Sequence, residues 1–333
     1  MGAVSLKWLK DLIGMALLFM FGYCFFVLDV KDLNLSLPSQ WLNVNTIFLG
    51  IVFEAIPFIL LGVFVSSFIQ IFVSERWIQK WIPKNPIIAL IPAAMVSAIF
   101  PVCECAIIPV VRRLIKKGMP LHVGIVLLVG APILNPIVFA STYYAFSSNS
   151  FIVYGRMGLA FILCMVIGFI VYVLFQNRDQ LRWTKDELIG AQQETTPQGN
   201  KVKQLLFHAS DEFFDMGKYL IVGAFIASLF QTFLDRSLLL DIGQHQTLGP
   251  LAMMGFAYVL SLCSEADAFV AASFLKTFTP SALLAFLVYG PMLDLKNTLM
   301  LFASFKTKFT LIFIIVVTIS VYISVLLLQV MMG

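Results

Sequence analysis

Thiols and acids interrupt two otherwise apolar stretches of the chain, at Cys103-Glu104-Cys105 and at Cys263-Ser264-Glu265. Three of the five cysteines lie in these two tripeptides. Thiolates are soft ligands that favour Cu(I) and zinc, and trivalent arsenic is thiophilic in the same sense. Acids placed inside a membrane mark proton or ion pathways. We therefore expect the three cysteines to bind a soft solute or metal, with the two glutamates handling protons.

The elements that carry these tripeptides must lie in a membrane. Hydrophobic residues make up 60% of the 333 residues and charged residues 12%, against about 25% charged in soluble domains. A spanning helix needs about 20 apolar residues. Runs of this kind occur at 11–28, 46–72, 121–146, 152–175, 213–234, 281–303 and 309–330. Since lipid excludes open sheets, the sequence predicts an all-α polytopic membrane protein with membrane lipid around it. The net charge of +4 is too small to indicate a nucleic-acid partner.

The two halves of the chain resemble each other. Residues 58–72 and 219–233 share Gly, Phe, Ser and Gln at the same positions, and the matches continue in order through Cys103 and Cys263 to Asn135 and Asp294. We interpret the chain as a single integral membrane domain, 1–333. Its parts are an N-terminal transmembrane helix and outer loop (1–40), repeat one (41–175), a cytoplasmic linker (176–204) and repeat two (205–333).

Two segments, 86–118 and 249–278, are too long for one span and too short for two. Each breaks at a cysteine tripeptide, which predicts two half-length pieces; in the first segment these are 87–102 and 104–115. If each segment is a re-entrant hairpin, the basic clusters gather on one face, as the positive-inside rule requires. The N-terminus is then cytoplasmic, and the two repeats have inverted topology, an architecture of many secondary transporters. Kinked single spans are the alternative.

Other polar residues in the apolar runs are candidates for the same site. Glu54 lies within a predicted span, just before Pro57. Asn135-Pro136 and Asp294 each follow a Gly-Pro element in corresponding helices, which predicts unwound backbone beside the site. Asp267 either faces the cavity or the outer vestibule, and Lys296 pairs with Asp294 or extends to the interface.

These motifs resemble the ArsP-type predicted permease family. The resemblance rests on Pro101-Val-Cys103-Glu-Cys105, the basic turn 112–120 and Gly130-Ala-Pro-Ile-Leu-Asn135-Pro136, and it covers residues 45 to 310. It implies a permease of the bacterial inner membrane, export of trivalent organoarsenicals or related thiophiles, and, for some members, a small membrane partner protein. The cysteines here are spaced Cys-x-Cys, whereas the arsenical-exporting members use an adjacent pair.

The sequence therefore predicts a secondary transporter for a thiophilic solute: a metalloid, an organoarsenical, a soft metal or a sulfur compound. The predicted binding residues are Cys103, Glu104, Cys105, Cys263, Ser264, Glu265, Asn135, Pro136, Asp294 and Glu54. Two alternatives stay open, namely a membrane thiol–disulfide protein and a non-transporting subunit of a membrane complex. An ATP-driven pump is disfavoured because the chain has no Gly-x-x-x-x-Gly-Lys phosphate loop. We expect no resident cofactor and no enzymatic activity.

Overall fold

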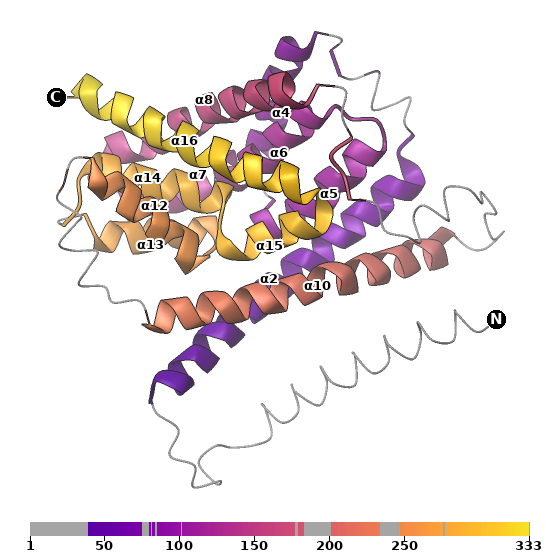
Figure 1. The fold of residues 1–333 in the computed structure, drawn as a ribbon, viewed down its shortest axis with the longest axis horizontal. Helices are drawn as coiled ribbons and strands as arrows, with labels where there is room; N and C mark the ends of the chain where they lie inside the picture. Colours follow the sequence, from indigo (N-terminus) through magenta and orange to yellow (C-terminus); the bar gives the residue numbers. More distant parts are fainter. Residues whose placement is uncertain are drawn as a thin grey trace, which may run out of the picture. The chain divides into compact units, whose positions relative to one another are not determined.

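The computed structural model describes residues 39–74, 80, 82–83, 85–100, 102–176, 179–182, 201–233, 245, 247–275 and 277–332. The predicted N-terminal helix and most of the predicted linker lie outside the described residues. The helices of the described part are α2 (Ser39–Phe72), α4 (Pro86–Ile99), α5 (Glu104–Lys116), α6 (Leu121–Leu134), α7 (Pro136–Ala145), α8 (Ser150–Phe175), α10 (Lys201–Phe233), α12 (Leu248–Leu260), α13 (Ser264–Ser273), α14 (Pro280–Met292), α15 (Leu295–Ser304) and α16 (Thr307–Met332) (Figure 1).

The described residues contain five helical segments long and apolar enough to cross a membrane: Gln40–Phe72, Leu121–Ala145, Ser150–Phe175, Gln204–Phe233 and Thr307–Met331. α16 shows how such a helix is built. Large apolar side chains at every fourth position are exposed, and those two positions away are buried, so one face packs and the other suits lipid. The prediction of a polytopic all-α membrane protein is confirmed at this level.

Two predicted spans are broken where the sequence predicts unwound backbone. Residues 121–146 form α6 and α7 on either side of Asn135, and residues 281–303 form α14, which ends at Met292, and α15, which begins at Leu295. Pro291 lacks an N–H and cannot continue the hydrogen-bond ladder. Asp294 then starts the new helix by accepting a hydrogen bond from the Asn297 backbone N–H at 2.6 Å.

Both cysteine tripeptides fall at helix breaks. Phe100 and Cys103 have extended backbone between α4 and α5. The chain passes from α12 to α13 through Ser261 in a left-handed conformation, φ 48°, and an extended Cys263. The predicted breaks are therefore observed, although the first helical piece ends at Ile99 and not at residue 102.

α4 and α5 form a hairpin along α6. At the start of α6, the backbone of Pro86 lies beside the His122 ring, and Gly124 faces Ile115 of α5. Further along α6, Gly130 faces Ser97 near the end of α4. α4 therefore runs with α6 and α5 returns against it, which excludes a single kinked helix for this segment.

α12 and α13 pack along α14 in a similar way. A Cβ at Gly290 of α14 would meet the Asp267 carboxylate of α13 at 3.0 Å and the Ala257 side chain of α12 at 3.4 Å. The absence of a side chain at Gly290 therefore lets both helices approach α14. The order and lengths of the six helices from α2 to α8 recur in the six from α10 to α16.

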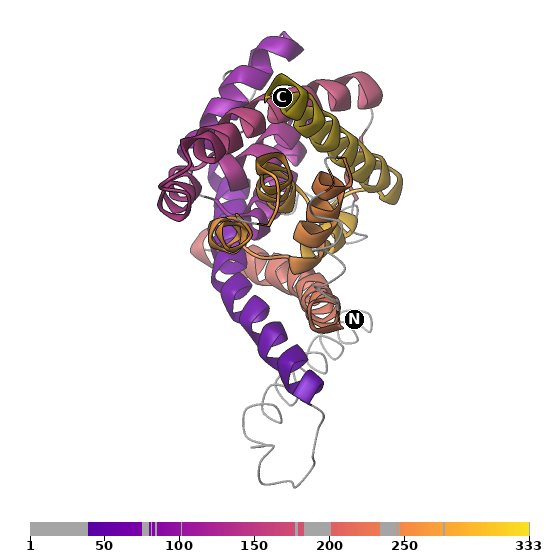
Figure 2. The same ribbon diagram turned by 90° about the vertical axis from the view of Figure 1, so that its left-hand side faces the viewer.

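The two sets of helices exchange contacts. α5 packs against α15, and α13 packs against α7. α2 and α10 cross each other (Figures 1 and 2), with Ile51 packed against Ala224 and Ala227. These exchanges bring the two breaks, which are 160 residues apart in sequence, into the same region.

α10 is continuous from Lys201 and so includes the last residues of the predicted linker. Leu181, within the predicted linker, forms a bridge to Phe305 at the end of α15. This contact ties the end of α8 to the start of α16.

Candidate functional site

Five charged side chains are buried together among the described helices. They are Glu104 of α5, Arg156 of α8, Asp267 of α13, and Asp294 and Lys296 at α15, all at most 4% exposed. We call them the central charge cluster. A charge buried in a low dielectric costs several kcal/mol unless it is paired, so this arrangement is a candidate site and not a packing detail.

The Lys296 ammonium joins three oxygens. Its Nζ lies 3.0 Å from Glu104 Oε1 and 3.3 Å from Asp294 Oδ2, and it donates to the Ser261 carbonyl at 2.7 Å. The left-handed turn at Ser261 is what turns that carbonyl toward the lysine, because it ends α12 at this point. The lysine thus connects the first break, the second break and the α14–α15 kink.

A direct hydrogen bond joins the two breaks. Ser264 Oγ donates to Glu104 Oε2 at 3.1 Å. Both residues are the first of their helices, α13 and α5, so two helix N-termini point into the cluster. The partial positive charge of a helix N-terminus favours a carboxylate there, which helps to stabilise Glu104 at this depth.

Arg156 holds the second break from the other side. It is completely buried, and its two terminal nitrogens donate to Thr142 Oγ1 at 2.6 Å and to the Ser264 carbonyl at 3.0 Å. Asp267 lies near enough to interact electrostatically with the guanidinium. Arg156 Nε and Asp267 Oδ2 have no hydrogen-bond partner within the described part of the chain.

Asn135 and Asp294 have the same structural role in the two kinked helices. Asn135 Oδ1 accepts from the Val138 backbone N–H at 2.9 Å and caps α7, as Asp294 caps α15. Asn135 Nδ2 donates to the Ala131 carbonyl. These hydrogen bonds are local, and none joins Asn135 to the central charge cluster, whereas Asp294 belongs to it.

The cysteines lie at the edge of the cluster. Cys103 and Cys263 are the N-cap residues of α5 and α13, without side-chain capping bonds. Both are half-buried and Cys105 is buried, and all three are free thiols. Within the described residues, no group of three or more His, Cys, Asp and Glu is arranged to hold a metal ion. Soft-metal binding by the three cysteines stays a prediction.

The other predicted residues are more exposed. Glu54 is exposed on α2 but lies within hydrogen-bonding reach of the Cys263 thiol, which also faces the half-buried Glu265. Pro136 is exposed at the first turn of α7. The structure therefore brings Glu104, Ser264 and Asp294 together, sets Cys263 beside Glu54 and Glu265, and leaves Asn135 and Pro136 apart.

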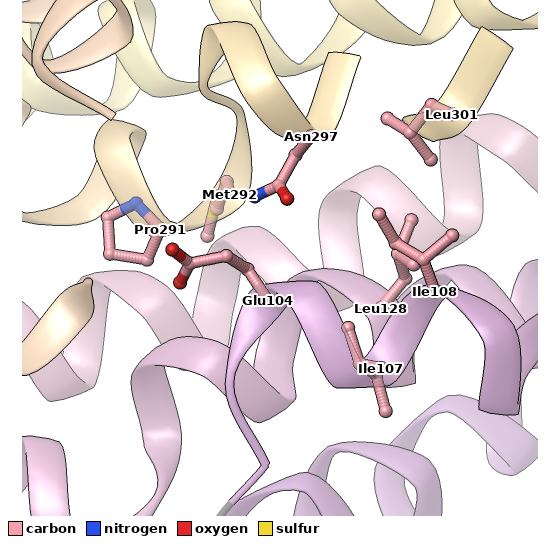
Figure 3. A pocket seen from close by; sticks show the side chains of 8 residues that line it. All are labelled: Glu104, Ile107, Ile108, Leu128, Pro291, Met292, Asn297 and Leu301. Atoms are coloured by element: carbon pink, nitrogen blue, oxygen red, sulfur yellow. The ribbon is translucent and has the colours of Figure 1, made fainter. Parts of the chain in front are cut away.

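A small cavity lies beside Glu104. Asn297 faces it from α15, and Pro291, Met292 and the apolar side chains of Ile107, Ile108, Leu128 and Leu301 complete its wall (Figure 3). Its volume is about 10 Å³, near the minimum for one water molecule. Side chains therefore fill nearly all of the space beside Glu104 in this structure.

Sequence reasoning missed Arg156 and gave Lys296 only a minor role. A signal for Arg156 was available, because it is a charged residue inside the apolar run 152–175, and such residues are functional candidates by default. Asn297 gave no comparable signal. Its importance depends on the kink at Asp294, which turns it toward the cavity.

A second group of buried polar contacts lies at the end of α5. Ser66 Oγ donates to Glu212 Oε2 at 2.7 Å, and Arg113 lies 3.4 Å from the same oxygen. Arg112 donates to the Arg182 carbonyl at 3.1 Å. The basic residues near the end of α5 therefore lie beside the segment that follows α8.

Comparisons with known proteins agree with this architecture. The family model described as "Predicted permease", of the ArsP type, matches residues 40–330. The chain is 47% identical over 280 residues to "UPF0718 protein YcgR" of Bacillus subtilis (strain 168), covering 84% of this chain and 95% of that protein. It is 40% identical over 284 residues to the "Putative two-component membrane permease complex subunit" of Streptococcus mutans serotype c (strain ATCC 700610 / UA159), covering 84% and 92%. No solved structure matches the chain at a significant level.

The long apolar helices, the family match over nearly the whole described region and two relatives that align over most of their length lead to one conclusion. The chain is a multi-pass bacterial membrane protein that belongs to the ArsP-type family of predicted permeases.

Proposed function

We propose that this chain is a secondary permease whose two hairpins, α4–α5 and α12–α13, enter the membrane from opposite faces and form a solute site between their tips. The observation that carries the proposal is the buried hydrogen bond between Ser264 and Glu104, which joins the two tips across 160 residues of sequence. Broken helices that meet between the two repeats are typical of transporters built from inverted repeats.

Contacts at the ends of α8 and α16 support the inversion. The end of α8 lies by the start of α6, through Tyr172 and His122, and by the start of α16, through Phe175 and Phe309. By contrast, Thr247, just before α12, accepts a hydrogen bond from Tyr322, thirteen residues beyond Phe309 in α16. Thirteen residues of α-helix extend about 20 Å, and this separation supports hairpins that start on opposite faces.

The orientation follows from the basic residues. Arg112, Arg113 and Arg182 meet at the end of the molecule where α5 and α8 finish. The positive-inside rule makes this the cytoplasmic end. A cytoplasmic N-terminus, in residues outside the described part, would fit the same orientation. Labelling of single cysteines at positions 113 and 147 from each side of the membrane would test it, and labelling of position 113 from outside would contradict it.

Transport would require the two tips to separate. In the closed conformation, Glu104 is bonded both to Ser264 and to Lys296, and the cavity beside it is too small for an organic solute. A solute that takes over part of these bonds lets the hairpins part without leaving a charge unpaired. The energetic requirement is large because an unpaired buried charge costs about 3–5 kcal/mol.

The proposed solute is thiophilic, in line with the family resemblance. Cys103 and Cys263 occupy equivalent N-cap positions, directly before Glu104 and Ser264, and both are half-buried. Sulfur is a soft ligand atom that binds soft metals and metalloids. The candidate solutes are trivalent organoarsenicals, other metalloids, soft metals and sulfur compounds.

A growth screen tests this function. A deletion strain carrying the chain is challenged with arsenicals, antimonials, copper, zinc and thiol compounds. Cys103→Ser, Cys263→Ser and Glu104→Gln should each change the concentration of the compound that the strain tolerates by about tenfold or more, toward that of the deletion strain. Each variant should still insert into the membrane. Cys164→Ser is the matched control, because this thiol is completely buried in α8 and belongs to neither cysteine tripeptide. Wild-type growth from all three site variants would disprove the site assignment.

A partner subunit forms part of the proposal. The Streptococcus mutans relative is described as a subunit of a two-component permease complex, and by analogy this chain would act with a second membrane protein. Transport by the purified chain alone in proteoliposomes would contradict that requirement. The two alternative functions give different results in the same assay: a thiol–disulfide protein traps a mixed disulfide at Cys103 or Cys263, and a non-transporting subunit moves no solute in any combination.

A further inference from the structure

Asp267 is the acid of the central charge cluster that lacks a salt bridge to either of the two bases of the cluster. Lys296 lies within 3.3 Å of both Glu104 and Asp294, and Ser264 donates to Glu104. Arg156, the second base, directs its terminal nitrogens to Thr142 and to the Ser264 carbonyl. Asp267 is 2% exposed, and its Oδ2 has no hydrogen-bond partner within the described chain.

The charges in the cluster do not balance. Three carboxyl groups face two basic groups, so full ionisation leaves one negative charge in excess. The groups that face Asp267 electrostatically are Arg156 from α8, Glu104 from α5, and Asp294 and Lys296 from the start of α15. α14 contributes Gly290, whose missing side chain leaves room for the carboxyl oxygen. An unpaired ionised oxygen in this position would have a high desolvation cost.

We propose that Asp267 is a proton-binding site, neutral in the closed conformation, and that its proton is the coupling ion of transport. The coupling role rests on the proposed permease function, whereas the proton site itself does not. On opening, water reaches the carboxyl, the O–H bond breaks and the proton passes to water. The resulting carboxylate stays beside the Arg156 guanidinium, which balances its charge.

Infrared spectroscopy tests the site without a solute. The purified chain in nanodiscs at pH 7 should show the C=O stretching band of a protonated carboxyl, shifted in D₂O. Asp267→Asn, an isosteric neutral side chain, should remove that band while the protein keeps its elution volume and thermal stability. Glu212→Gln is the matched control, since Glu212 is a buried acid outside the cluster, paired with Arg113 and Ser66; it should leave the band unchanged.

A second variant keeps the test decisive if Asp267→Asn does not fold. Glu104→Gln leaves two acids and two bases, so Asp267 can ionise beside Arg156 and the band should again disappear. A band that persists in both variants, or a wild-type protein without the band, would overturn the proton site. If the band behaves as expected but proteoliposomes that hold the chain together with its partner subunit move no solute with protons, the site stands and the proposed permease function fails.

Discussion

The two kinked helices, α6–α7 and α14–α15, have the same build and different electrostatics. In each pair the first helix contains a proline near its end. The second helix then begins at a residue whose side chain caps it, Asn135 in one case and Asp294 in the other. Two residues after the cap, the first has the exposed Ile137 and the second has the buried Lys296. Two helix pairs of similar build therefore carry an uncharged side chain at this position in α7 and a charged one in α15.

The long helices α8 and α16 differ in the same way. The seventh residue of α8 is Arg156 and that of α16 is Phe313, and both are completely buried. The scaffold therefore accepts a cation or an aromatic ring at corresponding positions. The charged residue, Arg156, lies where it can donate a hydrogen bond to the second break. We infer that local geometry is set by the repeated scaffold and the site by the residues that differ between its halves.

The largest expected effect comes from removing the cation of α15. Lys296→Met leaves Glu104 and Asp294 without their shared partner, and the free energy of unfolding should fall by about 3–5 kcal/mol, as measured by thermal or denaturant unfolding of the purified protein. Lys218→Met is the control, because this lysine forms an exposed pair with Asp215; it should change stability by less than about 1 kcal/mol. Equal losses of stability in Lys296→Met and Lys218→Met would show that burial of the ion pair is unimportant.

The second-largest effect tests whether α8 and α16 accept the same residue at this position. Arg156→Phe introduces the residue found at the corresponding position of α16, and it should destabilise the protein by about 3 kcal/mol because Thr142 and the Ser264 carbonyl lose their hydrogen bonds to a charged group. Phe313→Leu should cost less than about 1.5 kcal/mol. Tolerance of Arg156→Phe, measured by the melting temperature, would mean that the arginine has no structural role.

A close helix contact gives a smaller effect. A Cβ at Gly62 of α2 would lie 2.7 Å from the Ala106 backbone of α5, so Gly62→Ala should cost about 1–3 kcal/mol. Gly50 is in the same helix with nothing within 4 Å, and Gly50→Ala should be neutral or stabilise the protein by up to about 1 kcal/mol. The same sign for both substitutions would contradict this packing.

The smallest effect compares the two caps. Asn135→Ala removes a local cap and should cost about 1 kcal/mol. Asp294→Ala removes a cap and one of the two carboxylates beside Lys296, so it should cost more. Unfolding of the two variants under identical conditions measures the difference. A larger loss of stability in Asn135→Ala than in Asp294→Ala would contradict the inferred electrostatic difference between the two kinked helices.

Residue types along the chain were enough to predict much of this architecture. Apolar run length indicates spanning helices because lipid leaves no other way to satisfy the backbone. The breaks at Cys103 and Cys263 were predictable since prolines and polar residues interrupt apolar runs there, and the kink at Asn135 followed from its flanking prolines. Helix boundaries were less accurate, as at Ile99 and at the start of α10, because tertiary contacts extend or shorten helix ends.

The linear order of residues alone determined that the chain spans a membrane and where its helices break, because these depend on local composition and spacing. It also predicts that the two halves are repeats. Only the tertiary structure decided which buried charges meet. Lys296 and Arg156 belong to the site because helix packing places their side chains against the opposite half of the chain. Long-range pairing of this kind depends on packing geometry that no local pattern encodes, and for that reason Asn135 stays outside a cluster that includes its counterpart Asp294.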